Sequence, residues 1–509
     1  RSPVEVTLRD LRSIDATNGQ RATANVNEQQ RSQQIFSVVR WRSLLFTVIM
    51  SSSPQINTPA ILSLIGKTPL IEVTRFDTGV CQLFLKLETQ NPTGSIKDRM
   101  ALAMVEAAEG HGDLKPGGTI IEATAGNTGL GLALVAAAKG YHLVLVIPDK
   151  MSQEKILHLR ALGAKTVITR SDVAKGHPEY YQDLAETIAR QTPNSFYVNQ
   201  FGNETNPLAH EQTTGPEVWE QMEQRVDAVV VGVGSSGTLT GLSRFFARVA
   251  PNCEMILADP AGSVLAGYVN NGTMNKPGSW LVEGIGEDFI PPIADLSRIR
   301  KAYSIPDEES FHAARELLKN EGVFAGSSSG TLFAAALKYC REQSTPKRVV
   351  TFACDSGNKY LSKMYNDIWM TDQGFLQRET FGDLRDVVSR RYQDGTVVSV
   401  GPSDTLLTAF NRMRIADISQ VPVLEKDRLI GILDESDLLT RVQNGGGTFR
   451  DEVRTAMTNR VETLEPSDSL DAVRCVLDAG KVAIVVEHGH FVGLITRIDL
   501  LNYLRRRIS

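Results

Sequence analysis

Lys97 lies in a turn-rich segment, residues 91–99, that leads directly into a predicted helix. The dipole at the start of a helix disfavours the ammonium form of a lysine, and partial burial has the same effect. A lysine whose pKa is lowered in this way can attack a carbonyl group and form a Schiff base. For Lys97 taken alone, a solvated lysine beside a turn is the simpler interpretation. The other motifs must therefore decide whether Lys97 is a Schiff-base lysine.

A second motif, Glu-Ala-Thr-Ala-Gly-Asn-Thr-Gly at residues 122–129, stands between a predicted strand and a predicted helix. Gly126 and Gly129 allow the backbone to approach a ligand closely. Free amides at a helix start, together with the hydroxyls of Thr124 and Thr128, suit a carboxylate. The alternative is a tight strand-to-helix turn that binds no ligand.

A third motif, Gly-Val-Gly-Ser-Ser-Gly-Thr-Leu-Thr-Gly at residues 232–241, follows a predicted strand that ends at Val231. Successive glycine and hydroxyl residues at a helix N-terminus form a cradle for phosphate. The motif is not a P-loop, because no Lys-Ser or Lys-Thr pair follows, and its match to the dinucleotide pattern G-x-G-x-x-G is weak by itself. A serine-rich segment, residues 325–330, also precedes a helix, and a helix cap is the alternative interpretation there.

Short β-branched runs alternate with helix-length segments from Ile61 to about Asp372, and they must position these motifs. Continuous apolar strands that alternate with helices indicate a parallel sheet covered on both faces, and hence an α/β fold. Such a fold places the strand-to-helix loops at the carboxyl ends of the strands, where ligands bind. The predicted strands are 119–122, 143–147, 166–168, 228–231, 255–258 and 348–352, and the predicted helices include 99–109, 129–139, 153–162 and 308–320.

The C-terminal part of the chain contains an internal repeat. Gly-Pro-Ser-Asp at residues 401–404 corresponds to Glu-Pro-Ser-Asp at 465–468, and Leu-Ile-Gly-Ile-Leu at 429–433 corresponds to Phe-Val-Gly-Leu-Ile at 491–495. Each unit is predicted to fold as strand, turn, helix, strand, strand, helix. Two units of this size bury little surface alone, so we expect them to pack together.

Composition excludes several classes of protein. The 509-residue chain has 42% hydrophobic and 22% charged residues and a net charge of −5, which is ordinary for a globular protein and predicts neither nucleic-acid nor membrane binding. Five scattered cysteines without a C-x-x-C pair favour reduced thiols in a cytoplasmic protein without a metal site. Residues 1–49 contain seven Arg and no Lys, and we expect them to be a non-native or disordered extension, with Met50 as the native start.

A Schiff-base lysine, a carboxylate loop and a phosphate cradle together describe a site for pyridoxal phosphate. The chain from about 57 to 370 resembles the fold-type II pyridoxal-phosphate β-replacement enzymes, the family of cysteine synthase and cystathionine β-synthase, and within it the bacterial-type cystathionine-forming members. The strings that carry this resemblance are NPTGSIKDR, TAGNTG, NPLAH, TTGPEVW, GVGSSGTLTG and EGIGEDFIP. The C-terminal repeat resembles tandem CBS domains, the Bateman module, through GILDESDLL and GLITRIDLL.

The resemblance implies a two-lobed catalytic domain with parallel sheets, followed by an α/β module of two CBS domains. The expected boundaries are residues 50–372 for the catalytic domain, 373–385 for a linker, 386–446 for the first CBS domain and 447–509 for the second.

The resemblance also implies roles for individual residues. Lys97 would hold the cofactor and move the Cα proton of the substrate, Asn127 would bond the ring hydroxyl, and Ser328 would bond the pyridine nitrogen. A neutral partner of that nitrogen favours elimination from Cβ over prolonged carbanion chemistry. The residues expected around the cofactor phosphate are Gly234, Ser235, Ser236, Gly237 and Thr238, and those expected around the substrate are Thr124, Ala125, Gly126, Thr128 and Gly284.

The implied reaction is the condensation of L-serine with L-homocysteine to give L-cystathionine and water, by a homodimer or higher homo-oligomer. A cysteine synthase that uses O-acetylserine and sulfide is the alternative enzyme, and an adenosine-ligand sensor without catalysis is the alternative from another class. Residues 1–80 contain neither Cys nor His, so no haem is expected. In the CBS module, Asp437, Thr496 and Asp499 are candidates for an adenosine-type ligand, with a dimerisation or scaffold role as the alternative.

Overall fold

The computed structural model describes residues 59–124, 126–149, 153–173, 176–443 and 446–508. The described residues from Ala60 onward belong to one compact unit, and the account below concerns this unit. The predicted extension at residues 1–49 and the candidate Ala125 lie outside the described residues.

The larger sheet has six strands in the order β1-β2-β10-β7-β8-β9. Every neighbouring pair is parallel except β1 and β2, which are antiparallel. Its strands are β1 (Leu70–Glu72), β2 (Gln82–Leu87), β7 (Ala228–Gly232), β8 (Glu254–Pro260), β9 (Ile299–Ile305) and β10 (Arg348–Ala353). The helices that accompany it are α7 (Gly215–Gln221), α8 (Gly237–Val249), α9 (Leu265–Asn271), α10 (Asp307–Glu321), α11 (Ser327–Arg341) and α12 (Asp367–Asp372).

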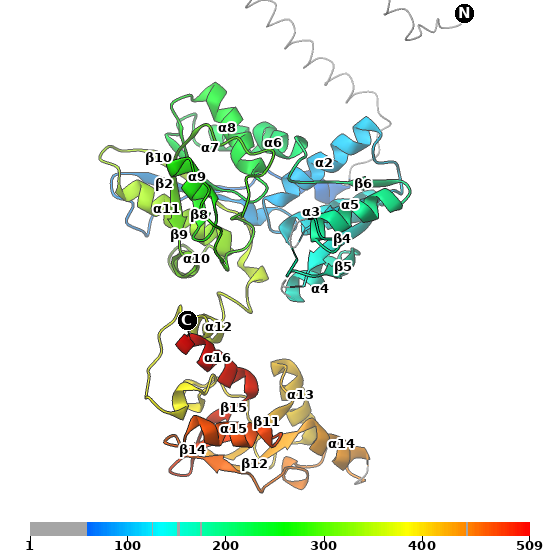
Figure 1. Ribbon diagram of the computed structural model, residues 1–509, viewed down its shortest axis with the longest axis vertical. Helices are drawn as coiled ribbons and strands as arrows, with labels where there is room; N and C mark the ends of the chain where they lie inside the picture. Colours follow the sequence, from blue (N-terminus) through cyan, green and yellow to red (C-terminus); the bar gives the residue numbers. More distant parts are fainter. Residues whose placement is uncertain (1–58, 125, 150–152, 174–175, 444–445, 509) are drawn as a thin grey trace, which may run out of the picture. The chain divides into compact units, whose positions relative to one another are not determined.

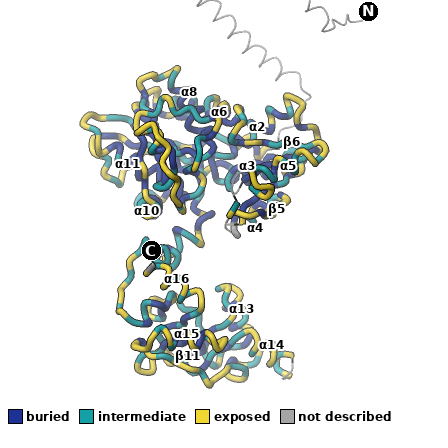
Figure 2. The backbone as a smooth tube through the Cα atoms, in the orientation of Figure 1, coloured by how far each residue is buried: buried dark blue, intermediate teal, exposed yellow. Residues whose placement is uncertain are grey.

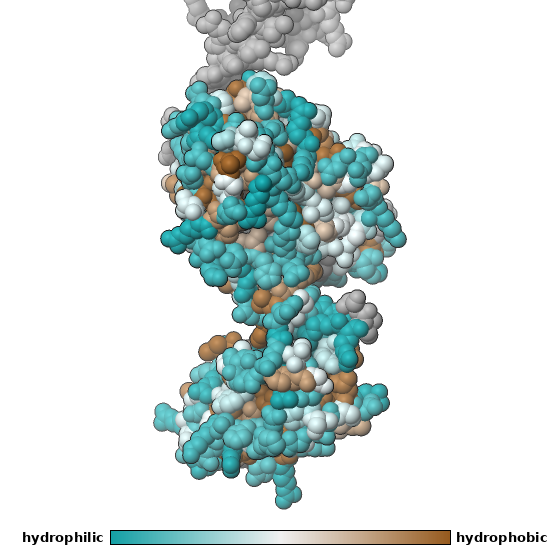
Figure 3. Space-filling model, turned by 90° about the vertical axis from the view of Figure 1, so that its left-hand side faces the viewer, coloured by the Kyte–Doolittle hydropathy of each residue, from teal (hydrophilic) through white to brown (hydrophobic). Residues whose placement is uncertain are grey.

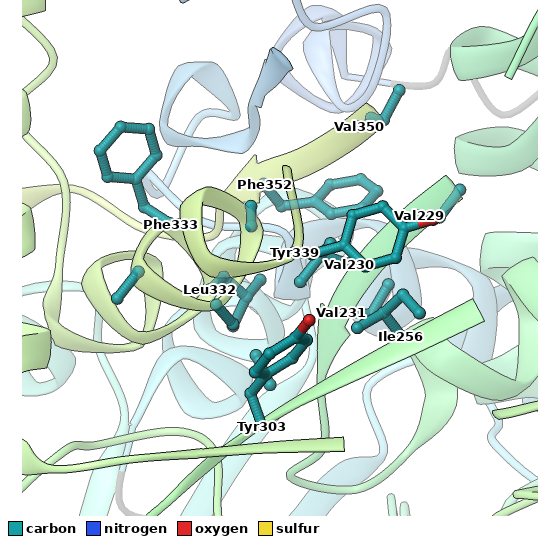
Figure 4. Close-up of a cluster of buried hydrophobic side chains, with 14 of the residues drawn as sticks. Val229, Val230, Val231, Ile256, Tyr303, Leu332, Phe333, Tyr339, Val350 and Phe352 are labelled. Atoms are coloured by element: carbon teal, nitrogen blue, oxygen red, sulfur yellow. The ribbon is translucent and has the colours of Figure 1, made fainter. Parts of the chain in front are cut away.

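The central strands of this sheet are apolar on both faces because helices cover both. Figure 4 shows side chains of β7 and β10 close to those of α11, among them Val230, Phe352 and Leu332. All three are at most 1% exposed. Burial of one side chain of this kind contributes roughly 1.5–3 kcal/mol to the free energy of unfolding. Many such side chains together make the sheet a stable support for the loops at its strand ends.

The smaller sheet has four parallel strands in the order β5-β4-β3-β6. Figure 1 shows the two sheets in separate lobes. The smaller sheet comprises β3 (Thr119–Ala123), β4 (His142–Pro148), β5 (Lys165–Thr169) and β6 (Ser195–Tyr197), and the neighbouring helices are α2 (Lys97–His111), α3 (Asn127–Lys139), α4 (Gln153–Ala161), α5 (Tyr181–Gln191) and α6 (Thr205–Ala209).

All six predicted strands and all four predicted helices are confirmed, with ends that shift by at most two residues. The sequence patterns did not identify β2, which contains Lys86. This lysine is fully buried, and its ammonium donates to Glu217 Oε2 at 3.0 Å. A charged residue in an apolar strand obscures the strand in the sequence, and only the tertiary partner explains it.

The two C-terminal repeats each contain a helix, a β-hairpin and a second helix. The first repeat comprises α13 (Leu406–Ala416), β11 (Gln420–Glu425), β12 (Arg428–Asp434) and α14 (Glu435–Gln443), and the second comprises β13 (Thr463–Leu464), α15 (Leu470–Asp478), β14 (Ala483–Glu487), β15 (His490–Ile495) and α16 (Arg497–Ile508). The predicted initial strand is confirmed in the second repeat. In the first repeat it is reduced to a single bridge between Val400 and Val423.

The two repeats pack on each other, as predicted. Leu424 of the first repeat shares an apolar cluster with Ile484 and Phe491 of the second, and all three are buried. The amide of Phe491 also donates to the carbonyl of Asp427 at 2.9 Å. Figure 2 shows buried backbone running through this module as well as through both lobes.

Hydrophilic residues cover most of the face shown in Figure 3, and hydrophobic residues are scattered among them. Within the described residues, no helix combines the length and the apolar character that a membrane span requires.

Candidate active site

Lys97 is the first residue of α2, as predicted. The loop before it is fixed from the other lobe, because the amide of Ile96 donates to the carbonyl of Cys354 at 2.9 Å. The Lys97 side chain keeps part of its surface open, and burial of the amine lowers its pKa. A lysine of this kind carries a larger share of the neutral, nucleophilic amine than a surface lysine does.

Two residues further along α2, Arg99 forms the centre of a buried ion-pair network. Its guanidinium makes bonds of 2.8 Å to each carboxylate oxygen of Glu88, and it also bonds Glu217 at 2.7 and 2.8 Å. Glu88 lies just after β2 and Glu217 lies in α7, so three separate segments meet at one side chain. The network therefore fixes the start of α2, and with it the position of Lys97.

The carboxylate loop follows β3 and ends at the start of α3. Within it, the amide of Gly126 donates to Thr124 Oγ1 at 3.3 Å. The Thr128 hydroxyl donates to Gln200 Oε1 at 2.8 Å. Gln200 was not predicted as a site residue, because no local motif marks it; it follows β6 and reaches the loop only through the parallel pairing of β3 with β6.

Glu122 lies in β3, directly before this loop. It is 1% exposed, and its carboxylate accepts hydrogen bonds from the amides of Ala123 at 2.9 Å and Gln200 at 3.2 Å. Burial raises the pKa of Glu122 to about 8, since desolvation outweighs these hydrogen bonds. The side chain is therefore protonated in the folded protein at neutral pH.

This protonation predicts a pH dependence of stability. In the unfolded chain Glu122 titrates near its ordinary value of 4.5, so between pH 4.5 and about 8 the folded protein binds a proton that the unfolded chain does not. The free energy of unfolding therefore falls as pH rises through this window. We expect Glu122→Gln, which cannot titrate, to have a smaller loss of urea-unfolding midpoint between pH 5.5 and pH 8.5 than the unmodified protein. Equal losses in both proteins would contradict the raised pKa.

The predicted phosphate cradle is the turn between β7 and α8. Ser236, the N-cap residue of α8, has a left-handed backbone with φ of 72°, and its side chain makes no capping hydrogen bond. A Cβ added at Gly237 would lie 1.8 Å from Asn206 Oδ1, and one added at Gly234 would lie 2.5 Å from the carbonyl of Gly284. The turn is thus closely packed around the backbone amides at the start of α8, and its residues fit a phosphate group.

Two further residues support the cradle. Asn206 Nδ2 donates to Ser235 Oγ at 3.0 Å, and Thr238 Oγ1 lies 3.2 Å from His210 Nε2. Asn206 and His210 stand in the NPLAH string, but only the fold assigns them this supporting role. Asn206 Nδ2 also donates to the carbonyl of Gln200 at 2.9 Å, which connects the cradle to the carboxylate loop.

Ser328 lies in the first turn of α11, as expected. Its two neighbours hold adjacent loops: Ser327 Oγ accepts from the amide of Glu283 at 3.0 Å, and Ser329 Oγ accepts from the amide of Cys354 at 2.9 Å. The serine-rich segment is therefore more than a helix cap, because its side chains bond two other segments to the start of α11. One segment contains Glu283 and Gly284, and the other follows β10.

Glu283, next to Gly284, is held between two lysines. Its carboxylate pairs with Lys155 of α4 and, at 2.7 Å, with Lys363. Burial alone would raise the pKa of Glu283, but the two ammonium groups outweigh it and hold the pKa below its usual range. Beside Lys155 a cavity of about 310 Å³ opens, whose walls include Thr93, Gly94, Lys155, His158, Ser356 and Lys359.

Asn127, the expected partner of the ring hydroxyl, is the first residue of α3. Its amide nitrogen donates to Asp355 Oδ2 at 2.8 Å, and its amide oxygen accepts from Lys359 Nζ at 2.6 Å. Lys359 was not predicted as a site residue. It comes from a short turn after β10, more than two hundred residues away in the chain, so the sequence gives no sign of this contact.

The candidates in the CBS module lie at the starts of two corresponding helices. Asp499 Oδ2 accepts from the amide of Thr496 at 2.7 Å and from its hydroxyl at 2.5 Å. In the first repeat, Asp437 and Asp434 each accept a backbone hydrogen bond from the other, at 3.1 and 2.8 Å. Burial raises the pKa of Asp437. The two positions therefore differ, with a hydroxyl beside the carboxylate in the second repeat and a second carboxylate in the first.

No group of three or more His, Cys, Asp or Glu with a metal-binding arrangement occurs among the residues that the structure describes. The candidate site instead comprises a half-buried lysine, the predicted carboxylate loop, the predicted phosphate cradle and a helix-start serine. Together with the two-lobed parallel architecture, this defines a pyridoxal-phosphate enzyme of the α/β type.

Comparisons with known proteins agree with this class. Residues 61–355 match the family of pyridoxal-phosphate dependent enzymes, and residues 384–444 and 452–506 match the CBS domain. The chain is 36% identical over 461 residues to the cystathionine beta-synthase of Apis mellifera, which covers 88% of this chain and 91% of the relative. The chain belongs to the cystathionine beta-synthase family of pyridoxal-phosphate dependent enzymes.

Other relatives match the catalytic part alone. Cysteine synthase A of Escherichia coli is 41% identical over 301 residues, which is 58% of this chain and 92% of the relative. A crystal structure of a hydrogen sulfide-producing enzyme from Fusobacterium nucleatum matches with a TM-score of 0.56 and 34% identity, over 59% of this chain and 99% of that one. The CBS module therefore distinguishes this chain from relatives that consist of the catalytic fold alone.

Proposed function

We propose that the chain catalyses the β-replacement that joins L-serine and L-homocysteine to give L-cystathionine and water. The observation that carries the proposal is the match to a cystathionine beta-synthase along both the catalytic part and the CBS module. Lys97, the carboxylate loop, the phosphate cradle and Ser328 supply the residues that such a reaction needs. Pyridoxal phosphate is the only cofactor in the proposal, held by Lys97, Asn127, the cradle at residues 234–238 and Ser328.

When bound, pyridoxal phosphate supplies the electron sink that makes the Cα proton of an amino acid acidic. The carboxylate loop, residues 124–128, binds the α-carboxylate of serine, and Gln200, which accepts the hydrogen of the Thr128 hydroxyl at 2.8 Å, holds that side chain in place. Because Glu122 is protonated beneath the loop, it places no negative charge next to that carboxylate.

Lys97 acts as the base and later the acid at Cα. Its lowered pKa makes the neutral amine available to remove the Cα proton. Loss of that proton and of the Cβ hydroxyl opens Cβ to the thiolate of homocysteine, and the proton that the thiol gives up balances the hydroxide, which leaves as water. Return of a proton from Lys97 to Cα completes the exchange of a C–O bond for a C–S bond. Ser328, a neutral side chain, fits elimination better than a carboxylate would, because it does not force a proton onto the ring nitrogen.

A product assay tests the proposal. Purified holoenzyme is incubated with L-serine and L-homocysteine, and the products are analysed by mass spectrometry; cystathionine is expected. The same enzyme is given O-acetylserine and sulfide in parallel. Rapid cysteine formation without cystathionine would replace the proposal with cysteine synthase activity. If a protein that has bound cofactor forms neither product, the result would favour the alternative of an adenosine-ligand sensor without catalysis.

We also propose that the chain is organised as a catalytic domain at residues 50–372, a linker at 373–385 and CBS domains at 386–446 and 447–509, and that it assembles as a homo-oligomer. For the CBS module we propose an adenosine-type ligand at Thr496 and Asp499, whose carboxylate and hydroxyl suit ribose hydroxyls. Calorimetric titration with S-adenosylmethionine and with adenine nucleotides tests this. No heat from any of them would support the dimerisation or scaffold role instead.

A further inference from the structure

The Asn127 amide lies between a donor and an acceptor that permit only one orientation. Lys359 Nζ donates to Oδ1 at 2.6 Å, and Nδ2 donates to Asp355 Oδ2 at 2.8 Å. An amide turned by 180° would set Nδ2 against an ammonium and Oδ1 against a carboxylate, and both bonds would be lost. The two neighbours therefore determine which end of the amide faces each side of the site.

Both neighbours are themselves fixed. Lys359 is 7% exposed and its ammonium also donates to the carbonyl of Gly94, at 3.2 Å. Asp355 is fully buried, and Tyr360 donates its hydroxyl to Asp355 Oδ2 at 2.8 Å. Lys359 thus joins the loop before Lys97 to the start of α3, where Asn127 lies. Side chains held in this way keep the amide in place without rearrangement when a ligand binds.

We propose that Lys359 is a positioning residue that holds the Asn127 amide with its nitrogen turned toward the oxygen of the cofactor ring. Nδ2 has two hydrogens, and Asp355 takes one of them, so one remains for a ring oxygen. With Lys359 removed, Oδ1 loses its partner and only Asp355 opposes the turned orientation, so a larger fraction of the protein holds the amide turned. In the turned state an acceptor would face the ring oxygen, and an oxygen that carries negative charge would be repelled.

The test uses binding of pyridoxal phosphate to the full chain after removal of the cofactor. We expect Lys359→Met to weaken cofactor binding about 10-fold, the value of one charge-assisted hydrogen bond, and to reduce the long-wavelength absorption of the bound cofactor. Lys359→Arg, which retains a donor, is expected to remain within about threefold of the unmodified protein. Lys338→Met, which removes an ammonium paired with Glu309 away from the site, is the matched control and is expected to match the unmodified protein.

A double-mutant cycle separates positioning from general loss of structure. In an Asn127→Ala background, Lys359→Met is expected to add no further weakening, because the amide through which it acts is absent. Equal weakening in both backgrounds would overturn the proposal, as would unchanged affinity and absorption in Lys359→Met. A raised KM for the thiol substrate with unchanged cofactor binding would also overturn it, in favour of a direct substrate contact from the cavity wall.

Folding is checked by thermal unfolding of each cofactor-free variant, and Lys359→Ala replaces Lys359→Met if the latter does not unfold cooperatively. The proposal depends on the pyridoxal-phosphate site and not on the substrates. Its readouts use the cofactor alone, so a failed product assay with serine and homocysteine would leave this test intact.

Discussion

Lys97→Ala is expected to lower kcat by at least about 1,000-fold, because one amine serves as both the covalent anchor of the cofactor and the acid–base group at Cα. The fold should remain, since the lysine is the first residue of α2 and alanine is the best helix former. Thermal unfolding of the cofactor-free variant should match that of the unmodified protein. The loss is therefore assigned to chemistry and not to structure.

The covalent assignment is checked directly by borohydride reduction of the holoenzyme, proteolysis and mass spectrometry. The cofactor mass is expected on the peptide that contains Lys97. Two other lysines, Lys155 and Lys359, line the adjacent cavity and are the real competitors for the cofactor aldehyde. Lys139→Ala, which removes an ammonium paired with Glu106 and Glu109, is the activity control. Label on Lys155 or Lys359 in the unmodified protein would contradict the assignment.

Arg99→Met is expected to destabilise the protein by about 3–5 kcal/mol. The substitution conserves much of the side-chain volume but leaves Glu88, which is fully buried, without its bidentate partner. An uncompensated buried carboxylate is costly because neither water nor a cation stabilises it. Glu217 loses the same partner, although Lys86 still pairs with it at 3.0 Å.

Urea unfolding followed by circular dichroism measures this effect. Arg170→Met is the control, since Arg170 and Asp172 form a pair on the surface and solvent screens it. We expect no measurable change for that variant. Because Arg99 also fixes the start of α2, Arg99→Met should weaken cofactor binding as well. Unchanged stability in Arg99→Met would contradict this prediction.

The supporting contacts of the site could not be read from the sequence, and Lys359 illustrates the reason. Motifs are local, so they identify residues that a single loop brings together, such as Thr124 and Thr128. Lys359 follows β10 and Asn127 is the first residue of α3. The two side chains meet only because the fold brings the end of β10 close to the start of α3. Gln200 and Glu122 are brought together in the same way, through strands β3 and β6.

The sequence by itself determined the fold class, the six strands and four helices with the strongest patterns, the internal repeat and the motifs of the cofactor site. These features depend on local spacing and on the alternation of apolar runs, which any chain displays before it folds. The tertiary structure decided which side chains hold those motifs in place: Arg99 between two carboxylates, Glu122 protonated beneath the loop and Lys359 against Asn127. Their roles arise from burial and from contacts between distant segments. Burial changes their pKa values, and it makes a buried charge costly unless a partner is present.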